Sequence, residues 1–222
     1  MAGLDEFFAT AFGQTSGYLC IAARKPEGKF TEYFFQYPED VETVSEFVRT
    51  RSLVENVYFC PQLLTEKRRI KTNVEECGSI WADLDGCHPS KLFIPPSISY
   101  ETSPGRYQAL WTLDAPADPE DAEDISRRIA YQHSDEGSDR SGWDLTQLLR
   151  IPGTRNYKYG QGTTAPKVQV VDWPDDVHTL DAFRQRYDQV SGYEYLDIPF
   201  PDYRPEKGDE ILERNRHRIN GA

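Results

Sequence analysis

The chain has 222 residues, with 25 Lys or Arg against 37 Asp or Glu, and its formal net charge is −12. Hydrophobic residues make up 38% of it, which is enough for a sizeable core and argues against a disordered chain. The acidic balance argues against a passive polyanion-binding protein, whose surface is usually basic, but not against a nucleotide enzyme whose carboxylates hold divalent metals.

Seven runs of alternating character, rich in β-branched and aromatic residues, predict strands. Three helical patterns follow candidate N-cap residues at Asp40, Asp118 and Thr179. This order lacks the strict βαβ rhythm of a doubly wound sheet, so we expect an α+β fold with mixed sheets and flanking helices. The predicted strands are Tyr18–Ala22, Thr31–Tyr37, Val57–Cys60, Ser79–Leu84, Ile98–Glu101, Tyr107–Leu113 and Lys167–Trp173.

The chain divides into a main domain and a C-terminal tail. We expect one domain over residues 1–192, with an exposed flexible loop at His133–Gly142, where Ser, Asp and Gly dominate. Residues 193–222 are predicted to be an irregular arm followed by a charged helix. No run of about 18 apolar residues occurs and no signal-peptide pattern is present, so we expect a cytoplasmic protein without a membrane partner.

One predicted strand ends in Asp83 and Asp85, with Gly86 following. Alternation places residues i and i+2 on the same face, about 6.5–7 Å apart. Both carboxylates can then converge on a hard divalent cation at the strand end. By itself the pair is equally typical of a turn cap or of a solvated surface.

A Pro-Gly turn between two strand patterns predicts a β-hairpin with Ser103 and Arg106 at its tip. These side chains, with the amide groups around Gly105, form a candidate anion site, and Gln108 begins the return strand. The alternative is an ordinary hairpin with a surface arginine.

A third segment begins with Asp144, a candidate third metal ligand, and continues with Arg150, Arg155 and Lys158. Arginine forks and a lysine point charge suit a triphosphate. The alternative is a loop whose basic residues neutralise an acidic protein.

Together these blocks resemble the archaeo-eukaryotic primase superfamily, and most of all the primase-polymerase domains of phage and plasmid replication proteins, including the RepB-like primases. The resemblance extends from about Tyr18 to Trp173. The blocks that carry it are Asp83-Leu-Asp85, Ser103-Pro-Gly105-Arg106-Tyr-Gln108, and Asp144 followed by Leu149-Arg150-Ile-Pro-Gly153-Thr-Arg-Asn156-Tyr-Lys158.

The resemblance implies an N-terminal α/β unit and a catalytic unit like an RNA-recognition motif, with a central cleft between them. It implies two Mg²⁺ or Mn²⁺ ions on the catalytic residues Asp83, Asp85 and Asp144. It also implies nucleotide contacts from the second block. Many members have histidine where this chain has Gln108, which can donate a hydrogen bond to a phosphate but carries no charge. The expected nucleotide-binding residues are Ser103, Arg106, Gln108, Arg150 and Lys158.

The resemblance implies the function of a DNA primase and polymerase, a template-directed nucleotidyltransferase that makes and extends primers on single-stranded DNA in phage or plasmid replication. Its partners would be the template, nucleoside triphosphates and a fused or associated helicase, to which residues 193–222 would be a linker. Lys67, Arg68, Arg69 and Lys71 form the densest basic cluster and are the candidate template contact, with a solvated charged loop as the alternative.

Two other classes of protein remain open at this point. One is a catalytically inert replication-initiator module that binds DNA without metal or nucleotide. The other is a metal-dependent glycosyltransferase, which also uses an Asp-x-Asp strand end. The sequence does not distinguish ribonucleotide from deoxynucleotide substrates.

Overall fold

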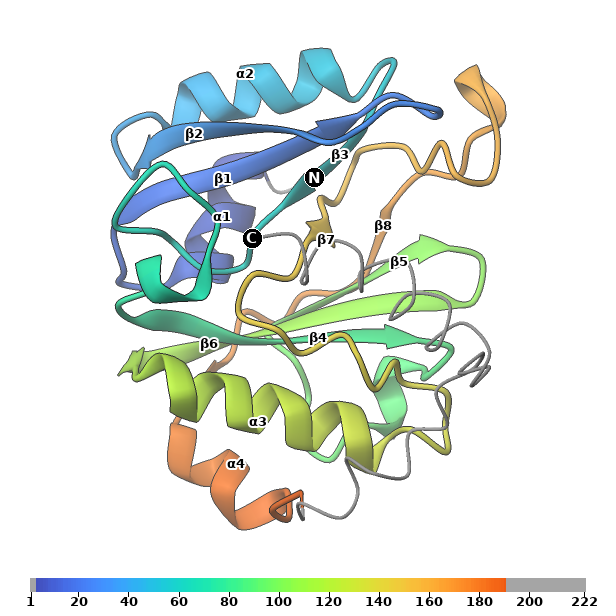
Figure 1. Cartoon of the computed structure of the whole chain (residues 1–222). Helices are drawn as coiled ribbons and strands as arrows, with labels where there is room; N and C mark the ends of the chain where they lie inside the picture. Colours follow the sequence, from blue (N-terminus) through green and yellow to red (C-terminus); the bar gives the residue numbers. More distant parts are fainter. Residues whose placement is uncertain (1–2, 191–222) are drawn as a thin grey trace, which may run out of the picture. The chain divides into compact units, whose positions relative to one another are not determined.

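The computed structural model describes residues 3–190 and shows two β-sheets, with helix α1 (Leu4–Phe12) between them and other helices on their outer sides (Figure 1). The first sheet has the order β2-β1-β3-β7, with every neighbouring pair antiparallel. Its strands are β1 (Gly17–Arg24), β2 (Thr31–Tyr37), β3 (Asn56–Phe59) and β7 (Leu149–Arg150). Helix α2 (Val41–Arg51) covers this sheet and buries Val44 and Val48, one turn apart.

The second sheet has the order β4-β6-β5-β8, and β9 adds to β6 in parallel. Helix α3 (Pro119–Gln132) packs on β4, and α4 (Leu180–Arg186) packs on α3. Because β4 is covered by α3 and α1, almost every residue of it is buried, which explains its continuous apolar sequence. The strands are β4 (Cys77–Asp85), β5 (Ile98–Ser103), β6 (Arg106–Ala117), β8 (Gln169–Asp172) and β9 (Val177–His178).

The α+β prediction is confirmed, and all seven predicted strands are present within one or a few residues. Two of the three predicted caps form: Asp118 accepts a hydrogen bond from the Glu120 amide, and Thr179 accepts one from the Ala182 amide. Asp40 precedes α2 but does not cap it, because its carboxylate accepts from the Gln36 amide instead. The predicted arm and charged helix at 193–222 lie outside the described residues.

Helix α1 (Leu4–Phe12) is not among the predicted helices, although its apolar residues recur at helical spacing. Its buried aromatic rings pack on Phe59 of the first sheet and Tyr100 of the second. Its C-terminal end lies so close to β4 that a Cβ on Gly78 would fall 1.8 Å from the carbonyl oxygen of Phe12. Glycine at position 78 is therefore needed for α1 to join the two sheets.

The segment His133–Gly142 differs from the expected exposed loop. His133 and Ser138 are buried. The Asp139 amide donates to the carbonyl of Asp83, and the Gly86 amide donates to the carbonyl of Gly137. The end of β4 holds this segment in place, so its polar composition reflects backbone turns rather than exposure.

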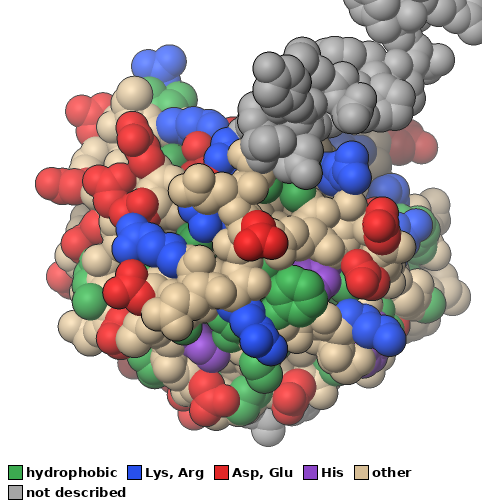
Figure 2. All heavy atoms as spheres, turned by 90° about the horizontal axis from the view of Figure 1, so that it is seen from below, with side chains coloured by type: hydrophobic (Ala, Val, Ile, Leu, Met, Phe, Trp, Pro, Cys, Tyr) green, Lys and Arg blue, Asp and Glu red, His purple; other side chains and the backbone are tan. Residues whose placement is uncertain are grey.

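Charged side chains of both signs are interspersed on the face seen from below in Figure 2, with no continuous basic area among the coloured residues. The negative net charge is thus spread over the visible surface. Within residues 3–190, no helix is both long and apolar enough to cross a bilayer.

Candidate active site

A pocket of about 470 Å³ is lined by residues from both sheets and by the loop after β7. Its walls include β1 and β3 on one side and β4, β5 and β6 on the other. Seven of the eight residues predicted to bind metal or nucleotide line it, and Asp144 is the exception. The seven are Asp83, Asp85, Ser103, Arg106, Gln108, Arg150 and Lys158.

The two carboxylates at the end of β4 share this pocket although a β-bulge separates them. Asp85 has a φ of +45°, a left-handed conformation that aspartate tolerates better than most residues. Gly142, in a neighbouring loop, packs closely against Asp83, because a Cβ on Gly142 would lie 2.6 Å from the Cβ of Asp83. The pKa of Asp83 is raised to about 6, mainly because burial removes water from its charged form and also because Asp85 and Asp139 repel that charge.

We expect Asp83→Asn to stabilise the metal-free protein at neutral pH. Because the folded-state pKa is raised from 3.8 to about 6, the folded state retains a proton that the unfolded state loses between these values. The free energy of unfolding therefore falls as pH rises through that window. Removing the charge should add about 3 kcal/mol at pH 7.5 and close to nothing at pH 3.5. Urea unfolding at the two pH values measures this, and an equal effect at both would contradict the assignment.

The hairpin between β5 and β6 places Arg106 beside the carboxylate pair. Its guanidinium lies 2.7 Å from the Asp85 carboxylate, and both side chains are about half exposed. Gly105 has the positive φ that the predicted turn requires. Its amide donates to the Glu101 carboxylate at 2.8 Å, so that amide is already used and the expected anion site at the tip reduces to Ser103 and Arg106.

Gln108 lies on β6 directly opposite Asp83 and is buried. Its carbonyl oxygen accepts from the backbone amide of Arg150 at 2.9 Å. Its hydrogen bond to Asp83 lowers the pKa of that carboxyl, against the stronger effect of burial. Gln108 therefore joins the carboxylate strand to the segment that carries Arg150.

Arg150 is a buried cation without an ion-pair partner among residues 3–190. Its guanidinium donates to Asn56 at 3.1 Å and to the Tyr58 hydroxyl at 2.8 Å, and it lies 4.6 Å from the centre of the Tyr58 ring. Burial lowers its pKa, while the nearby Tyr58, Tyr159 and Asp83 act in the opposite direction. A guanidinium held rigidly by neutral groups is prepared to bind an anion in the pocket.

Loop contacts after β7 present Lys158 to the same pocket. The Asn156 side-chain amide donates to the Thr102 carbonyl, and its Oδ1 atom accepts from the Lys158 backbone amide. The Lys158 side chain is exposed, and its ammonium lies over the Tyr159 ring. Arg155 instead donates to the carbonyls of Thr163 and Ala165, so it holds the loop and does not face the pocket.

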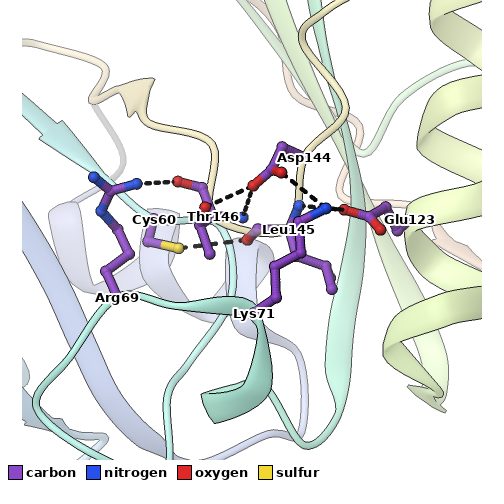
Figure 3. A network of polar contacts seen from close by, with 7 residues as sticks. All are labelled: Cys60, Arg69, Lys71, Glu123, Asp144, Leu145 and Thr146. Carbon is purple, nitrogen blue, oxygen red and sulfur yellow. Dashed lines mark hydrogen bonds and ion pairs between the residues drawn. The ribbon is translucent and has the colours of Figure 1, made fainter. Parts of the chain in front are cut away.

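The structure does not bring Asp144 to Asp83 and Asp85. Its carboxylate lies 2.8 Å from the Lys71 ammonium and accepts from the amide and hydroxyl of Thr146 (Figure 3). Burial raises its pKa but these hydrogen bonds lower it, and the net shift is downward. Among residues 3–190, no three acidic, histidine or cysteine side chains are grouped so as to hold a metal. A role for Asp144 as a metal ligand therefore stays a prediction, and in this conformation Lys71 neutralises it.

Two members of the predicted template-binding cluster are also occupied. Lys71 contacts Glu123 as well as Asp144, and Arg69 pairs with Glu32 at 2.8 Å and donates to the Thr146 carbonyl. Burial lowers the pKa of Lys71, but the two carboxylates raise it by more, so the net shift is upward and the ammonium stays charged. Lys67 and Arg68 are exposed and have no ion pair within the described chain. The template-binding role of the four residues stays a prediction. Lys67 and Arg68 are the two whose side chains are free to contact DNA in this conformation.

We therefore expect Lys71→Gln to leave affinity for single-stranded DNA unchanged, because its charge is already paired. The stability loss should be small, about 1 kcal/mol, since the ammonium is nearly half exposed. Fluorescence anisotropy with labelled DNA measures the affinity, and the double variant Lys67→Gln, Arg68→Gln is the comparison. A loss of affinity from Lys71→Gln as large as that from the double variant would contradict this expectation.

Several residues of the site are not evident from the sequence. Asn56 and Tyr58 position Arg150, and Arg24 lines the pocket. Asp139 is the acid that, after Asp85, raises the pKa of Asp83. Asn56 and Tyr58 belong to the Asn56-Val-Tyr58-Phe-Cys60 run, which shares the family resemblance but by itself assigns them no role. Arg24 and Asp139 belong to no local motif. The pairing of β3 with β1 and β7 brings Asn56, Tyr58 and Arg24 together.

The comparisons with known proteins agree with this geometry. Residues 90–171 match the family of the RepB DNA-primase N-terminal domain. The resemblance to RepB-like primases is confirmed. This match includes the hairpin and the segment from Asp144 to Lys158, and it begins after Asp83 and Asp85. No curated protein sequence matched the chain.

Three solved structures are similar in fold to this chain. The crystal structure of primase RepB′ has 18% identity and a TM-score of 0.57, covering 96% of this chain and 68% of that one. The catalytic domain of primase RepB′ in complex with initiator DNA has 18% identity and a TM-score of 0.59, covering 96% of each chain. The cyanophage S-2L primase-polymerase domain has 12% identity and a TM-score of 0.60, covering 83% of this chain and 97% of that one. At these identities the likeness shows that the chain has the fold of a primase catalytic domain.

Proposed function

We propose that the chain is a template-directed nucleotidyltransferase, a primase-polymerase that makes and extends primers on single-stranded DNA. The observation that carries the proposal is the meeting of two carboxylates, Asp83 and Asp85, with the cations Arg106, Arg150 and Lys158 in one pocket. Phosphoryl transfer depends mainly on positioning and charge stabilisation, so this combination suits a nucleoside triphosphate.

The donor set fits a divalent ion. Asp83 and Asp85 are hard oxygen ligands that line one pocket. Burial first, and the Asp85 charge second, raise the pKa of Asp83, and a bound cation would offset both effects. A bound Mg²⁺ or Mn²⁺ would act as a Lewis acid on the phosphoryl oxygens and the departing pyrophosphate. We propose two such ions, for which Asp144 would have to leave Lys71 or another oxygen donor would have to take its place.

The cations of the pocket have separable roles in this proposal. Arg150 is fixed by Asn56 and Tyr58, and it would bind the triphosphate as a rigid fork. Lys158 is exposed, and it would follow the phosphates as a point charge. Arg106 is paired with Asp85 and would exchange this partner for a phosphate when a metal takes up the carboxylate charge. Gln108 would keep Asp83 and Arg150 in register and not bind the nucleotide directly.

The test is a primer-synthesis assay with single-stranded DNA, ribonucleotides or deoxynucleotides, and Mg²⁺ or Mn²⁺ in turn. Products whose formation needs both template and metal support the proposal. DNA binding without nucleotide binding or product would favour the inert initiator module. Tighter binding of a sugar nucleotide than of a nucleoside triphosphate would favour the glycosyltransferase.

A further inference from the structure

Two exposed aromatic side chains border the pocket on the side of the first sheet. Phe30, in the connection between β1 and β2, is 44% exposed, and Tyr159, in the loop after β7, is 52% exposed. Tyr159 lines the pocket together with Arg24 and Pro26 from the β1–β2 hairpin. The β1–β2 connection and the loop after β7, far apart in the sequence, therefore contribute to one pocket. Their backbones run toward the upper right of Figure 1.

A row of cation–ring and ring–ring contacts leads from Phe30 into the pocket. The Arg24 guanidinium lies 5.4 Å from the centre of the Phe30 ring, and this ring meets Tyr58 edge to face at a centroid distance of 5.4 Å. Arg150 covers Tyr58 in turn, at 4.6 Å. Phe30 is thus held in position by its neighbours while much of its surface stays open to solvent.

The same hairpin carries two lysines without an ion pair in the described part of the chain. Lys25 and Lys29 are exposed, and neither has an ion pair among residues 3–190. The Nε atom of Arg24 is buried without a hydrogen-bond partner. Glu27 is the one acid between the two lysines, and it is also exposed. Unpaired cations beside exposed aromatic rings are the chemistry by which proteins bind single-stranded nucleic acid, because phosphates meet the cations and bases stack on the rings.

The geometry points to a template-binding rim, formed by Phe30, Tyr159, Lys25 and Lys29, on which bases of single-stranded DNA stack. The inference rests on the proposed function and adds the surface that takes the template. A polymer is favoured over a free nucleotide because Phe30 lies outside the lining of the pocket.

The test compares two labelled probes by fluorescence anisotropy, an oligothymidylate and an abasic oligomer of the same length. Phe30→Ala and Tyr159→Ala should each weaken oligothymidylate binding by at least about fivefold, the lower end of the effect of losing one stacked base. Binding of the abasic oligomer should not change. Phe30→Trp should retain the affinity, because it keeps a ring at the position.

Phe93→Ala is the matched control, because Phe93 is 45% exposed but lines no part of this pocket. It should bind both probes as the unsubstituted protein does. The double variant Lys25→Gln, Lys29→Gln should weaken the binding of both probes alike. For each phosphate that is no longer neutralised, the slope of log affinity against log salt concentration should become shallower by about 0.7. Circular dichroism and thermal unfolding confirm that each variant is folded.

Three results would overturn the inference. One is unchanged oligothymidylate binding by both aromatic variants. The second is an equal loss on both probes, which would mean that the rings do not contact bases. The third is a raised KM for nucleotide with unchanged DNA affinity. Base-dependent DNA binding by a protein that makes no primers would reject the proposed function and support the template-binding rim. Primer synthesis that the aromatic variants do not affect would support the proposed function and reject the rim.

Discussion

Replacing both strand-end carboxylates, Asp83→Ala with Asp85→Ala, is expected to reduce nucleotide incorporation by about a thousandfold. The pair supplies the negative oxygen atoms that would hold a divalent ion, and losing such an ion removes several kcal/mol of charge stabilisation from the transition state. Extension of a labelled primer on a DNA template measures the rate.

The matched control for this experiment is Asp114→Ala. Asp114 is an exposed carboxylate on β6 that does not line the pocket, so its removal lowers the negative charge without touching the site. Its incorporation rate should stay within about twofold of the unsubstituted protein, because isolated surface charges contribute little. A double variant that extends primers as fast as this control would contradict the assignment of Asp83 and Asp85.

Removing the buried guanidinium, Arg150→Ala, is expected to lower incorporation by about a hundredfold, as losing one preorganised donor to a developing charge does in other enzymes. Arg150→Lys keeps the charge but cannot donate to Asn56 and Tyr58 together, so it should chiefly raise the KM for nucleotide. Steady-state kinetics over a range of nucleotide concentrations separates the two effects.

Measurements of the free energy of unfolding distinguish a catalytic effect of Arg150→Ala from a loss of folded protein. Arg150→Ala removes the donor to the Tyr58 hydroxyl, at a cost of about 1–3 kcal/mol, while Asn56 Oδ1 still accepts from the Tyr157 amide. The substitution also removes a buried unpaired charge. We therefore expect a folded variant, and Arg49→Ala on the exposed side of α2 is the control. Normal kinetics for Arg150→Ala would show that the guanidinium serves only to hold the sheet.

Local patterns predict much of this fold and site. Alternation identifies β4 and the hairpin, and motif order brings Asp83, Arg106 and Arg150 into one hypothesis. These succeed because each depends on neighbouring residues in the chain. The hairpin turn forms as predicted because the turn requires a positive φ, which Gly105 adopts without steric cost.

The remaining features depend on contacts between distant segments. Asp144 looks like a third ligand in sequence, yet Lys71 holds it in an ion pair that no local pattern reveals. Because Lys71 is paired with Asp144, the basic cluster offers fewer free cations to DNA than its sequence indicates. Arg24 lies in no motif, and it enters the site because β1 pairs with β3 beside Tyr58. Unpaired cations can be recognised only when all their neighbours are known.

The negative net charge and a nucleic-acid substrate are compatible in this structure. The pocket combines Asp83 and Asp85 with three nearby cations, so charge compensation is local and does not need a basic surface. The isolated chain is expected to bind template weakly and with strong salt dependence.

Incorporation on homopolymer templates is the decisive measurement for a template-directed enzyme. We expect oligothymidylate to direct incorporation of adenine nucleotides alone and oligodeoxycytidylate to direct guanine nucleotides alone. Both reactions should disappear without divalent metal and in the Asp83→Ala, Asp85→Ala variant. Incorporation that ignores the template base, or that persists in that variant, would contradict the proposed function.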